Sequence, residues 1–383
     1  FQNNVRSVAV SGTDYSNFYY CITCYVSQPA QTHYMNYEKV TISDIAKAAG
    51  VSITTVSRYI NGKQDLIQKD TRERIEAVIK MTNYHPNVMA QSLKTNLSHH
   101  IGVIVSDIST PFCATLIQGI SETLLSSNYM PLFVTCNNSI KEEESYIRSL
   151  MSRHVDGLIV NTCSSQNPSL IQQACNGLPI VLCDRTIDDY NFQFVGSNHR
   201  DPIFELVKHL KEQGYTLPVF FTENYFASSV RSERRNSFLD AVKLYYPEVD
   251  PNELTYVIDT HDTQNVTSQL HHLKDICGKK ELPAIFCVNS ITVLHVFNAI
   301  RSLGIHIPDE IGLCGPDDWG WEEQSILLSL MTPRITNIVV QPRLIGNLAA
   351  QKLLECIADP SVTKKETRLT CPLQIAGSTI LKH

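Results

Sequence analysis

Segment 40–62, VTISDIAKAAGVSITTVSRYING, constrains this chain more than any other stretch. Thr41 and Asp44 have the spacing of a capping box, in which each residue hydrogen-bonds the backbone of the other and starts a helix. Apolar residues then recur at helical spacing, and Gly50 can end the helix in a left-handed conformation. The segment therefore predicts two short helices joined by a tight turn.

The second of these helices starts after Ser52, a favourable N-cap, and turns Val56 and Ile60 inward. Its outer face keeps short polar groups and one arginine, which suits a DNA major groove because hydroxyl and guanidinium groups can reach base edges and phosphates. An ordinary helical hairpin with a solvated face has the same periodicity, so this alternative stays open. The outward residues are Ile53, Thr54, Thr55, Ser57 and Arg58.

The same stretch closely resembles the helix-turn-helix of the lactose-repressor (LacI/GalR) family, which reads V-T-[IL]-x-D-[IV]-A-x-x-A-G-V-S-x-x-T-V-S-R-x-[IL]-N. Every fixed position of that pattern is present. The resemblance implies a sequence-specific transcriptional regulator, and a repressor, that binds pseudo-palindromic operator DNA as a homodimer. The expected DNA-binding residues of the head are Thr41, Ser52, Ile53, Thr54, Thr55, Ser57, Arg58, Asn61, Thr71 and Tyr84.

Charge is distributed unevenly along the 383 residues, whose net charge is −6. Residues 35–98 carry nine Lys and Arg against six Asp and Glu, whereas the chain from 99 onward carries 22 against 31. The basic excess thus accompanies the predicted helix-turn-helix, as contact with phosphates requires. An acidic remainder suits a body that stays off the DNA.

Targeting and metal signals are weak in this sequence. No apolar run approaches the roughly 18 to 20 residues of a membrane span, and the start lacks the pattern of a secretory signal. We expect a cytoplasmic protein with no membrane partner, whose 12 cysteines serve mainly as small buried hydrophobes. Cys21 and Cys24 form a C-x-x-C without a second pair, so no metal or cofactor is expected.

We expect four regions along the chain. Residues 1–34 are almost uncharged and precede Met35, where members of the family usually begin; they are left unassigned as a start-site artefact. Residues 35–82 form the helix-turn-helix domain, completed by a third helix in KDTRERIEAVIKMTNY. Residues 83–98 form a hinge and linker, and 99–383 form the effector-binding and dimerisation core.

The hinge expectation comes from the family, because N-Y-x-P-N-x-x-A-x-x-L matches its hinge segment. Composition alone leaves a plain linker equally open. Pro86 and Asn87 can start a short helix, since proline fits a first helical turn. The resemblance implies that this helix folds only on DNA, from both subunits. Ala90 would permit close approach to the minor groove, and Leu93 would wedge between base pairs.

From His99 the pattern alternates strands and helices, which is typical of parallel sheets. Two sets follow in tandem, the second from near Asp201, and a helix around RLIGNLAAQKLLECI closes the run. The expected fold is a small all-α helix-turn-helix head and an α/β periplasmic-binding-protein-like core of two doubly wound subdomains. The resemblance adds chain crossovers between the subdomains.

Polar residues at strand ends are the candidate ligand contacts, since ligands of such sheets bind outside the carboxyl ends of strands. Singly, each could be a cap, a turn residue or a surface ion pair. The family's R-x-x-G-F appears with Ser237 in place of glycine, and the acid usual after Asn289 is Ser290. The expected effector-binding residues are Ser106, Phe112, Asp184, Arg185, Arg234, Asn289, Asp317 and Trp319.

The effector is expected to be a sugar or sugar acid. The run D-D-W-G-W, followed by P-R-I-T-N-I-V-V-Q-P, is similar to repressors that respond to 2-keto-3-deoxygluconate or related sugar acids. Arg185 and Arg234 suit a carboxylate, which arginine binds in a bidentate manner. Trp319 could stack on a sugar face or pack internally.

Two other functional classes share part of this pattern. A solute-binding protein of transport or chemoreception would share the core but not the DNA-binding head. An enzyme is not expected, because G-x-S-x-G, H-E-x-x-H and Walker motifs are absent. His271 and His272 lack a second ligand pair and are expected to face solvent. Whether the effector induces or co-represses, and whether dimers pair into tetramers, stays open.

Overall fold

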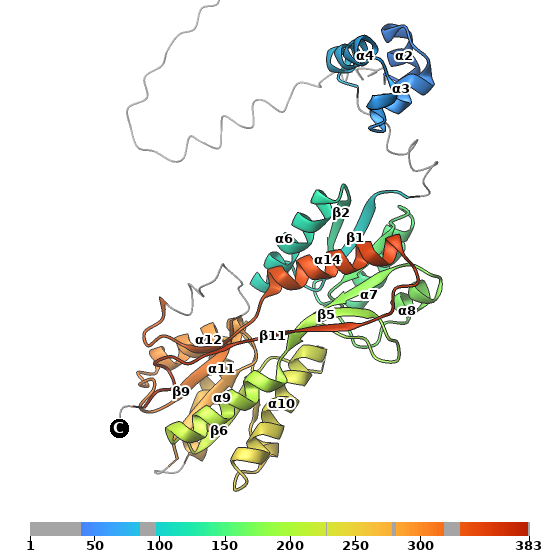
Figure 1. The fold of residues 1–383 in the computed structure, drawn as a ribbon. Coiled ribbons are helices and arrows are strands. Elements are labelled where there is room, and N and C mark those ends of the chain that lie inside the picture. The colour runs from blue at the N-terminus through green and yellow to red at the C-terminus, as the bar shows by residue number, and fades with distance from the viewer. Residues whose placement is uncertain (1–39, 85–96, 227, 278–280, 318–329, 382–383) are drawn as a thin grey trace, which may run out of the picture. The chain divides into compact units, whose positions relative to one another are not determined.

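The computed structural model describes residues 40–84, 97–226, 228–277, 281–317 and 330–381. The chain divides into two compact units, Phe1–Asn87 and Val88–His383. Figure 1 shows the helical head, which belongs to the first unit, and the α/β core, which belongs to the second. Several expectations fall outside the described residues: the extension 1–34, Cys21, Cys24, Asn87, Ala90, Leu93 and Trp319.

The head consists of helices α2 (Ile42–Ala49), α3 (Ile53–Ile60) and α4 (Lys69–Thr82), with a 3-10 turn at Gln64–Leu66. The predicted caps are confirmed. Thr41 N–H donates to Asp44 Oδ2 over 2.8 Å, and Asp44 N–H donates to Thr41 Oγ1 over 3.3 Å. Gly50 ends α2 at φ 64°. The head core is Ile45, Ala46, Ala49, Val56, Ile75 and Tyr84.

The first subdomain is built on a six-stranded sheet in the order β11-β5-β4-β3-β1-β2, with every neighbouring pair parallel. Helices α6 and α14 supply apolar side chains to one face, and α7 and α8 to the other. The strands are His100–Val105, Met130–Thr135, Gly157–Val160, Ile180–Cys183 and Gln193–Asn198 for β1 to β5, and Glu366–Thr370 for β11. The helices are α6 (Pro111–Ser126), α7 (Ile140–Met151), α8 (Pro168–Cys175) and α14 (Pro342–Ala358).

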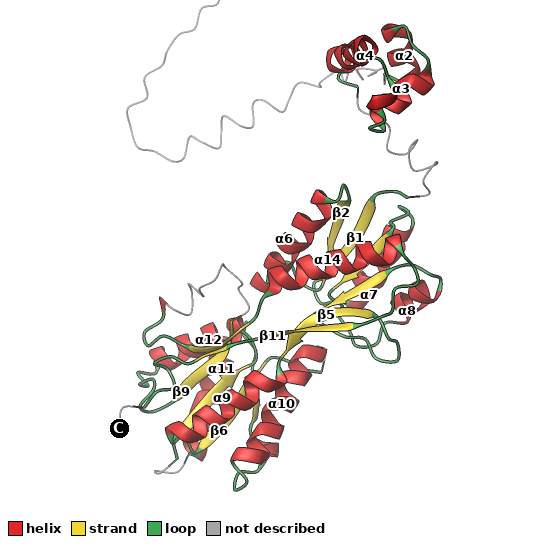
Figure 2. Ribbon diagram, viewed as in Figure 1, coloured by secondary structure: helices red, strands yellow, loops and turns green. Residues whose placement is uncertain are grey.

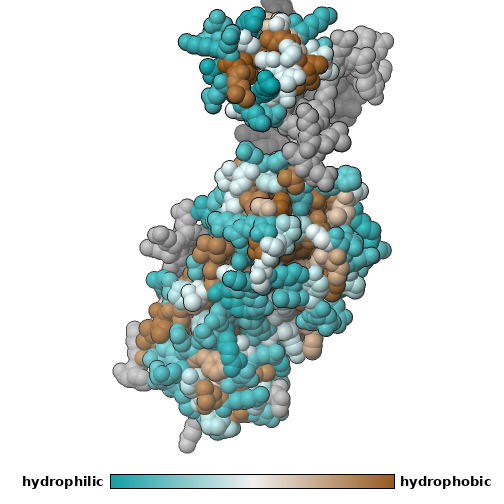
Figure 3. Space-filling model, turned by 45° about the vertical axis from the view of Figure 1, so that its right-hand side comes forward, coloured by the Kyte–Doolittle hydropathy of each residue, from teal (hydrophilic) through white to brown (hydrophobic). Residues whose placement is uncertain are grey.

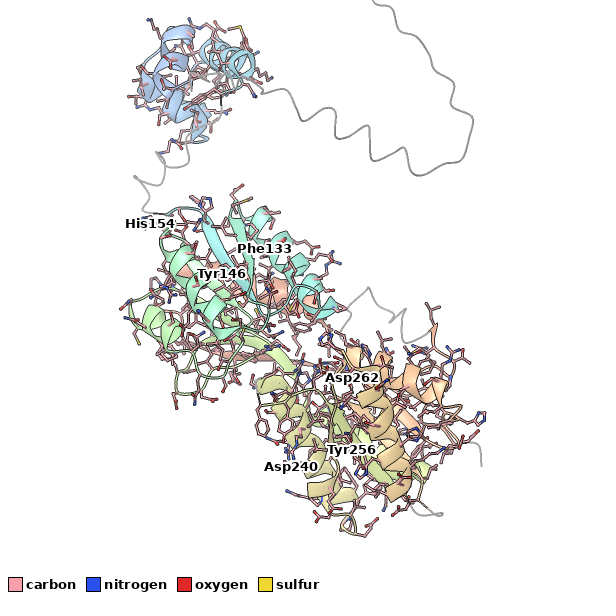
Figure 4. All side chains as sticks on the ribbon, turned by 180° about the vertical axis from the view of Figure 1, so that it is seen from behind. Phe133, Tyr146, His154, Asp240, Tyr256 and Asp262 are labelled. Carbon is pink, nitrogen blue, oxygen red and sulfur yellow. The ribbon has the colours of Figure 1, made fainter. Side chains whose placement is uncertain are left out.

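The second subdomain repeats this plan in the order β12-β10-β9-β8-β6-β7, with only β12 antiparallel to its neighbour. Figure 2 shows its strands between helices. Tyr256 of β7 stacks on Phe221 of β6, with ring centroids 4.9 Å apart (Figure 4). The strands are Leu217–Thr222, Thr255–Val257, Pro283–Cys287, Gly312–Asp317 and Thr336–Val339 for β6 to β10, and Leu373–Gln374 for β12. The helices are α9 (Arg200–Gln213), α10 (Ser229–Tyr245), α11 (Thr263–Ile276) and α12 (Ser290–Ser302), with a 3-10 turn at Pro251–Glu253.

The chain passes between the subdomains three times: from β5 to α9, from β10 to α14 and from β11 to β12. The expected crossovers are thus confirmed, but the expectation that the helix near 342–358 closes the run is wrong. That helix, α14, packs on the first sheet, and two strands follow it. Strand β11 reads ETRLT and is half exposed, so its pattern lacks the apolar run that marked the other strands. Strands β5 and β10 and helix α8 were also left out of the expected series.

Helices α6 and α14 approach each other closely because two glycines meet their partner's backbone. A Cβ on Gly119 would overlap the carbonyl oxygen of Arg343, and a Cβ on Gly346 would overlap that of Leu116. The backbones therefore touch where other residues would hold them apart. This contact fixes α14 on the first sheet, far in sequence from the strands it covers.

None of the helices in the described part of the chain combines the length and the apolar character of a bilayer span. On the face seen in Figure 3, apolar side chains lie in small groups among polar ones. His271 and His272 are exposed, as expected.

Candidate DNA-binding head and effector cleft

The outer face of α3 is the candidate DNA-reading surface. Val56 is fully buried and fixes the helix on the head core, while Ile53 keeps 49% of its surface exposed. Thr54 and Arg58 are also exposed. Val56 and the exposed polar residues lie on opposite sides of the same two helical turns. Because Val56 is fixed in the head core, the exposed polar side of α3 has a fixed orientation.

Two hydroxyl groups on α3, those of Thr55 and Ser57, already have local partners. Ser52 caps the helix by accepting the Thr55 N–H over 3.2 Å, and the two hydroxyl groups lie 2.8 Å apart. Asn61, at the C-cap, donates to Ser57 Oγ over 3.2 Å. Thr55 and Ser57 are only half exposed, so Thr54 and Arg58 are the freest polar groups of this face.

The other expected contacts of the head occupy different settings. Thr41 is exposed, and its hydroxyl bonds the Asp44 carboxylate, a contact that lowers the pKa of Asp44. Thr71 is half exposed in the first turn of α4. Tyr84 is 9% exposed and packs in the head core, where burial raises its pKa. Its ring therefore serves packing, which the sequence did not indicate.

A cavity of about 360 Å³ lies between the two subdomains, at the carboxyl ends of strands from both sheets. Six of the eight expected effector residues line it. Asp317 is the last residue of β9, and Trp319 lies outside the described residues. The six are Ser106, Phe112, Asp184, Arg185, Arg234 and Asn289.

On the first subdomain, the buried residues Ser106 and Asn161 hydrogen-bond each other and line the cleft. Ser106 Oγ donates to Asn161 Oδ1 over 2.6 Å, and Asn161 Nδ2 donates to the Cys183 carbonyl over 3.1 Å. Both side chains are at most 2% exposed. Ser106 is therefore held by its neighbour, and Asn161, which follows β3, is a lining residue that the sequence reasoning missed.

Arg234 is the most deeply buried cation of the cleft, with 4% of its surface exposed. Its Nη1 donates to the Val288 carbonyl over 2.7 Å, and its Nε has no hydrogen-bond partner among the described residues. Arg235 points elsewhere, since its guanidinium lies 4.7 Å from the Tyr225 ring centroid and its Nε donates to Thr255 Oγ1. The two adjacent arginines thus differ in role.

Glu223, on the second subdomain, forms polar contacts with three side chains. Glu223 accepts from Asn289 Nδ2 over 2.9 Å and from Thr260 Oγ1 over 3.3 Å, and it forms an ion pair with Arg231. Asn289 also caps α12 by accepting the Thr292 N–H over 2.8 Å. Glu223 directly follows β6, so the strand-end criterion applied elsewhere would have found it.

Most cysteines of the described core are buried, as expected for side chains that serve as small hydrophobes. Cys113, Cys183 and Cys287 are buried, and burial raises the pKa of each. They are therefore protonated and unreactive near neutral pH. Among the described residues, no three His, Cys, Asp or Glu side chains gather as a metal site.

Two family models together match most of the chain. Residues 41–87 match the model described as bacterial regulatory proteins, lacI family. Residues 98–377 match the model described as periplasmic binding proteins and sugar binding domain of LacI family. The order of the two matches follows the order of head and core.

Curated relatives match over nearly their whole length. The HTH-type transcriptional regulator KdgR of Bacillus subtilis is 31% identical over 321 residues, which cover 83% of this chain and 91% of KdgR. The HTH-type transcriptional regulator PtxS of Pseudomonas putida is 30% identical over 351 residues, covering 92% and 98%. The sucrose operon repressor of Pediococcus pentosaceus is 30% identical over 342 residues, covering 88% and 98%.

A solved structure supports the same fold. The lac repressor dimer bound to operator and the anti-inducer ONPF is similar with a TM-score of 0.77 at 23% identity, covering 90% of this chain and all of that chain. The chain therefore belongs to the LacI family of bacterial regulatory proteins, as a helix-turn-helix transcriptional regulator with an effector-binding α/β core.

Proposed function

We propose that this protein is a repressor that binds a pseudo-palindromic operator as a homodimer and releases or holds it according to a sugar acid in the cleft. The proposal that this protein binds DNA rests on helix α3. Thr54 and Arg58 are exposed on this helix, and the buried Val56 anchors it to the head core. Two such helices would read half-sites in successive major grooves. The remaining head contacts are proposed as in the sequence analysis.

The proposed effector carries both a carboxylate and hydroxyl groups. Arg234 brings a buried guanidinium with an unbonded Nε, and Arg185 adds a second cation on the opposite wall. Burying an arginine is costly unless an anion or strong acceptors meet it. Asp184, Asn289 and Glu223 offer acceptors and donors for hydroxyl groups. The volume of about 360 Å³ is within the range for small-molecule sites.

We propose that the segment 83–98 couples the cleft to the DNA. Asn87, Ala90 and Leu93 would form hinge helices from both subunits on the operator, with Leu93 wedged between base pairs. A change in the angle between the subdomains would change the spacing of the two hinges. Reversing operator occupancy in this way takes a differential affinity on the order of 5 kcal/mol.

This proposal assigns no catalytic role to the cleft and places the protein in the cytoplasm, where its operator is. Asp317 and Trp319 are included as proposed effector contacts on the strength of the family pattern. The main competing class, a solute-binding protein, is disfavoured by the head, which a transport protein does not need.

The test uses the full chain and selection of duplexes from a random library at fixed salt, followed by fluorescence anisotropy. We expect a two-fold symmetric site that is bound at least a thousandfold more tightly than random DNA. Adding a panel of sugar acids, including gluconate and 2-keto-3-deoxygluconate, should change that affinity, whereas glucose and ribose should not. Failure to enrich any sequence would overturn the regulator proposal.

The hinge has its own test in Leu93→Ala. This variant should keep the melting temperature of the core but weaken operator binding, because the wedge is lost. Leu244→Ala, which makes the same change at an exposed leucine of α10 in the core, is the matched control. Unchanged operator affinity in Leu93→Ala at the same salt would remove the hinge from the mechanism.

A further inference from the structure

Glu143 is a carboxylate in an unexpected place. It lies on α7 within the run EEE, which reads as a solvated helical face, yet its side chain is fully buried. Its neighbours Glu142 and Glu144 are half exposed. A buried carboxylate is costly unless polar groups meet it, so its position calls for a specific partner.

The main partner is the Thr162–Cys163 peptide group, just beyond the end of β3. Glu143 Oε2 accepts the backbone N–H of Cys163 over 2.9 Å. The carbonyl of the same peptide group, that of Thr162, accepts Arg185 Nη1 over 3.1 Å. Arg185 and Cys163 both line the cleft, whereas Glu143 does not.

The two contacts reinforce each other electrostatically. The peptide dipole has its positive N–H end at the carboxylate and its negative carbonyl end at the guanidinium, so each charge polarises the bond to the other. The charge of Arg185 and the Cys163 N–H both oppose the rise that burial causes in the pKa of Glu143. Glu143 Oε1 has no partner among the described residues. Of the hydrogen bonds that oppose the effect of burial on the pKa of Glu143, the one from the Cys163 N–H is the largest, ahead of those with the Thr162 and Cys163 side chains.

We infer that Glu143 is a positioning residue for effector recognition, which holds the Thr162–Cys163 peptide and through it fixes the Arg185 guanidinium at the wall of the cleft. The inference rests on the proposed function, because it takes Arg185 as a group that meets the acid of the effector. It explains why an acidic side chain is buried behind a cleft that is proposed to bind an anion.

The first test needs no effector. Hydrogen exchange at the Cys163 amide is measured by mass spectrometry in the full chain and in Glu143→Ala, Glu143→Gln and Arg185→Ala. We expect exchange at least tenfold faster in Glu143→Ala and close to that of the unaltered protein in Glu143→Gln, whose amide oxygen can still accept the N–H. Arg185→Ala should raise the same rate by a smaller factor, because it frees the carbonyl side. Glu144→Gln is the charge-matched control and should change nothing.

The second test measures binding of 2-keto-3-deoxygluconate by calorimetry. Glu143→Ala should weaken binding at least tenfold, and Glu143→Gln should restore most of it. In the Arg185→Ala background the further loss from Glu143→Ala should be under threefold, since the two residues act through one contact. A merely structural role would lower the affinity by the same factor in both backgrounds.

The outcomes separate the two proposals. Unchanged exchange at Cys163 in Glu143→Ala, or equal losses of affinity in both backgrounds, overturns the role of Glu143. Absence of binding of every sugar acid by the unaltered protein overturns the proposed effector class instead, and the exchange rates then still decide whether Glu143 and Arg185 share the peptide.

Discussion

The head and the cleft present their polar groups in opposite ways. On α3, Thr54 and Arg58 are exposed on a helix that a six-residue core holds in place. In the cleft, Arg234 and Asn161 are buried and already bonded to neighbouring protein groups. Exposed charges act through water and are screened by salt, whereas buried ones act at short range in a weakly screening medium. The head is therefore suited to a long polyanion, and the cleft to one small, exactly oriented molecule.

The largest effect should come from breaking the support of α3. Val56→Asp places a carboxylate where the side chain is fully buried, and this should destabilise the head by at least about 3 kcal/mol. Operator binding should be lost, while sugar-acid binding by the core stays within twofold. Anisotropy and calorimetry on the same protein measure the two. Parallel loss of both activities would contradict the independence of head and cleft.

The cleft should respond most to its buried cation. Arg234→Ala removes the guanidinium and should weaken sugar-acid binding by about 2 to 3 kcal/mol, as expected for hydrogen bonds to a charged group. The affinity should change little between low and moderate salt. Arg235→Ala is the matched control, because that side chain stacks on Tyr225 outside the cleft. Equal losses in the two variants would mean that Arg234 acts through folding.

The head should lose less from one exposed arginine. Arg58→Ala should weaken operator binding by about 1 to 3 kcal/mol if the side chain reads a base edge, and the slope of affinity against salt should fall by about one if it meets a phosphate. Arg148→Ala removes an exposed charge from α7 of the core and should alter neither value. Identical binding curves for Arg58→Ala and the unaltered protein would remove α3 from the interface.

The smallest expected effect is a difference between core and head in how the free energy of unfolding depends on pH. Burial and the nearby charges of Arg234 and Arg368 hold the pKa of His199 well below its usual value, and burial lowers that of His209. Below about pH 6.5 the unfolded chain therefore binds protons that the folded core does not, so the free energy of unfolding falls as the pH falls, by up to about 1.4 kcal/mol per pH unit for each residue. Residues 40–84 contain no histidine.

Urea unfolding of the core between pH 7.5 and 5.5 measures this loss. His199→Gln should flatten the dependence, and the helical signal of the head should change little over the same range. An unaltered pH dependence in His199→Gln would contradict the assigned protonation state of His199.

The head could be predicted nearly completely because its determinants are local. Thr41, Gly50 and Ser52 each act on backbone groups within a few residues, so their spacing alone reveals the caps. Tyr84 is the exception, since its burial depends on the assembled three-helix core.

The cleft could be predicted only in outline. Strand ends, helix starts and the family's R-x-x-G-F pattern located six of its residues, but what each contacts is set by segments far away in the chain. Ser106 bonds Asn161, and Glu223 bonds Asn289 across 66 positions. Glu143 was missed because a carboxylate is not expected in a core, although its spacing from Ile147 and Leu150 places it on the buried face of α7. Edge strand β11 was not predicted either, because its largely polar sequence ETRLT resembles a loop.

The three crossovers mean that the two subdomains are interleaved along the chain rather than joined end to end. The central strands of the second subdomain come from 217–339, but its edge strand β12 comes from the far end of the chain, after the polypeptide has returned to complete the first sheet with β11. No single cut in the gene would yield two self-sufficient pieces. Engineers who wish to exchange sensing modules between relatives would have to transplant three junctions at once.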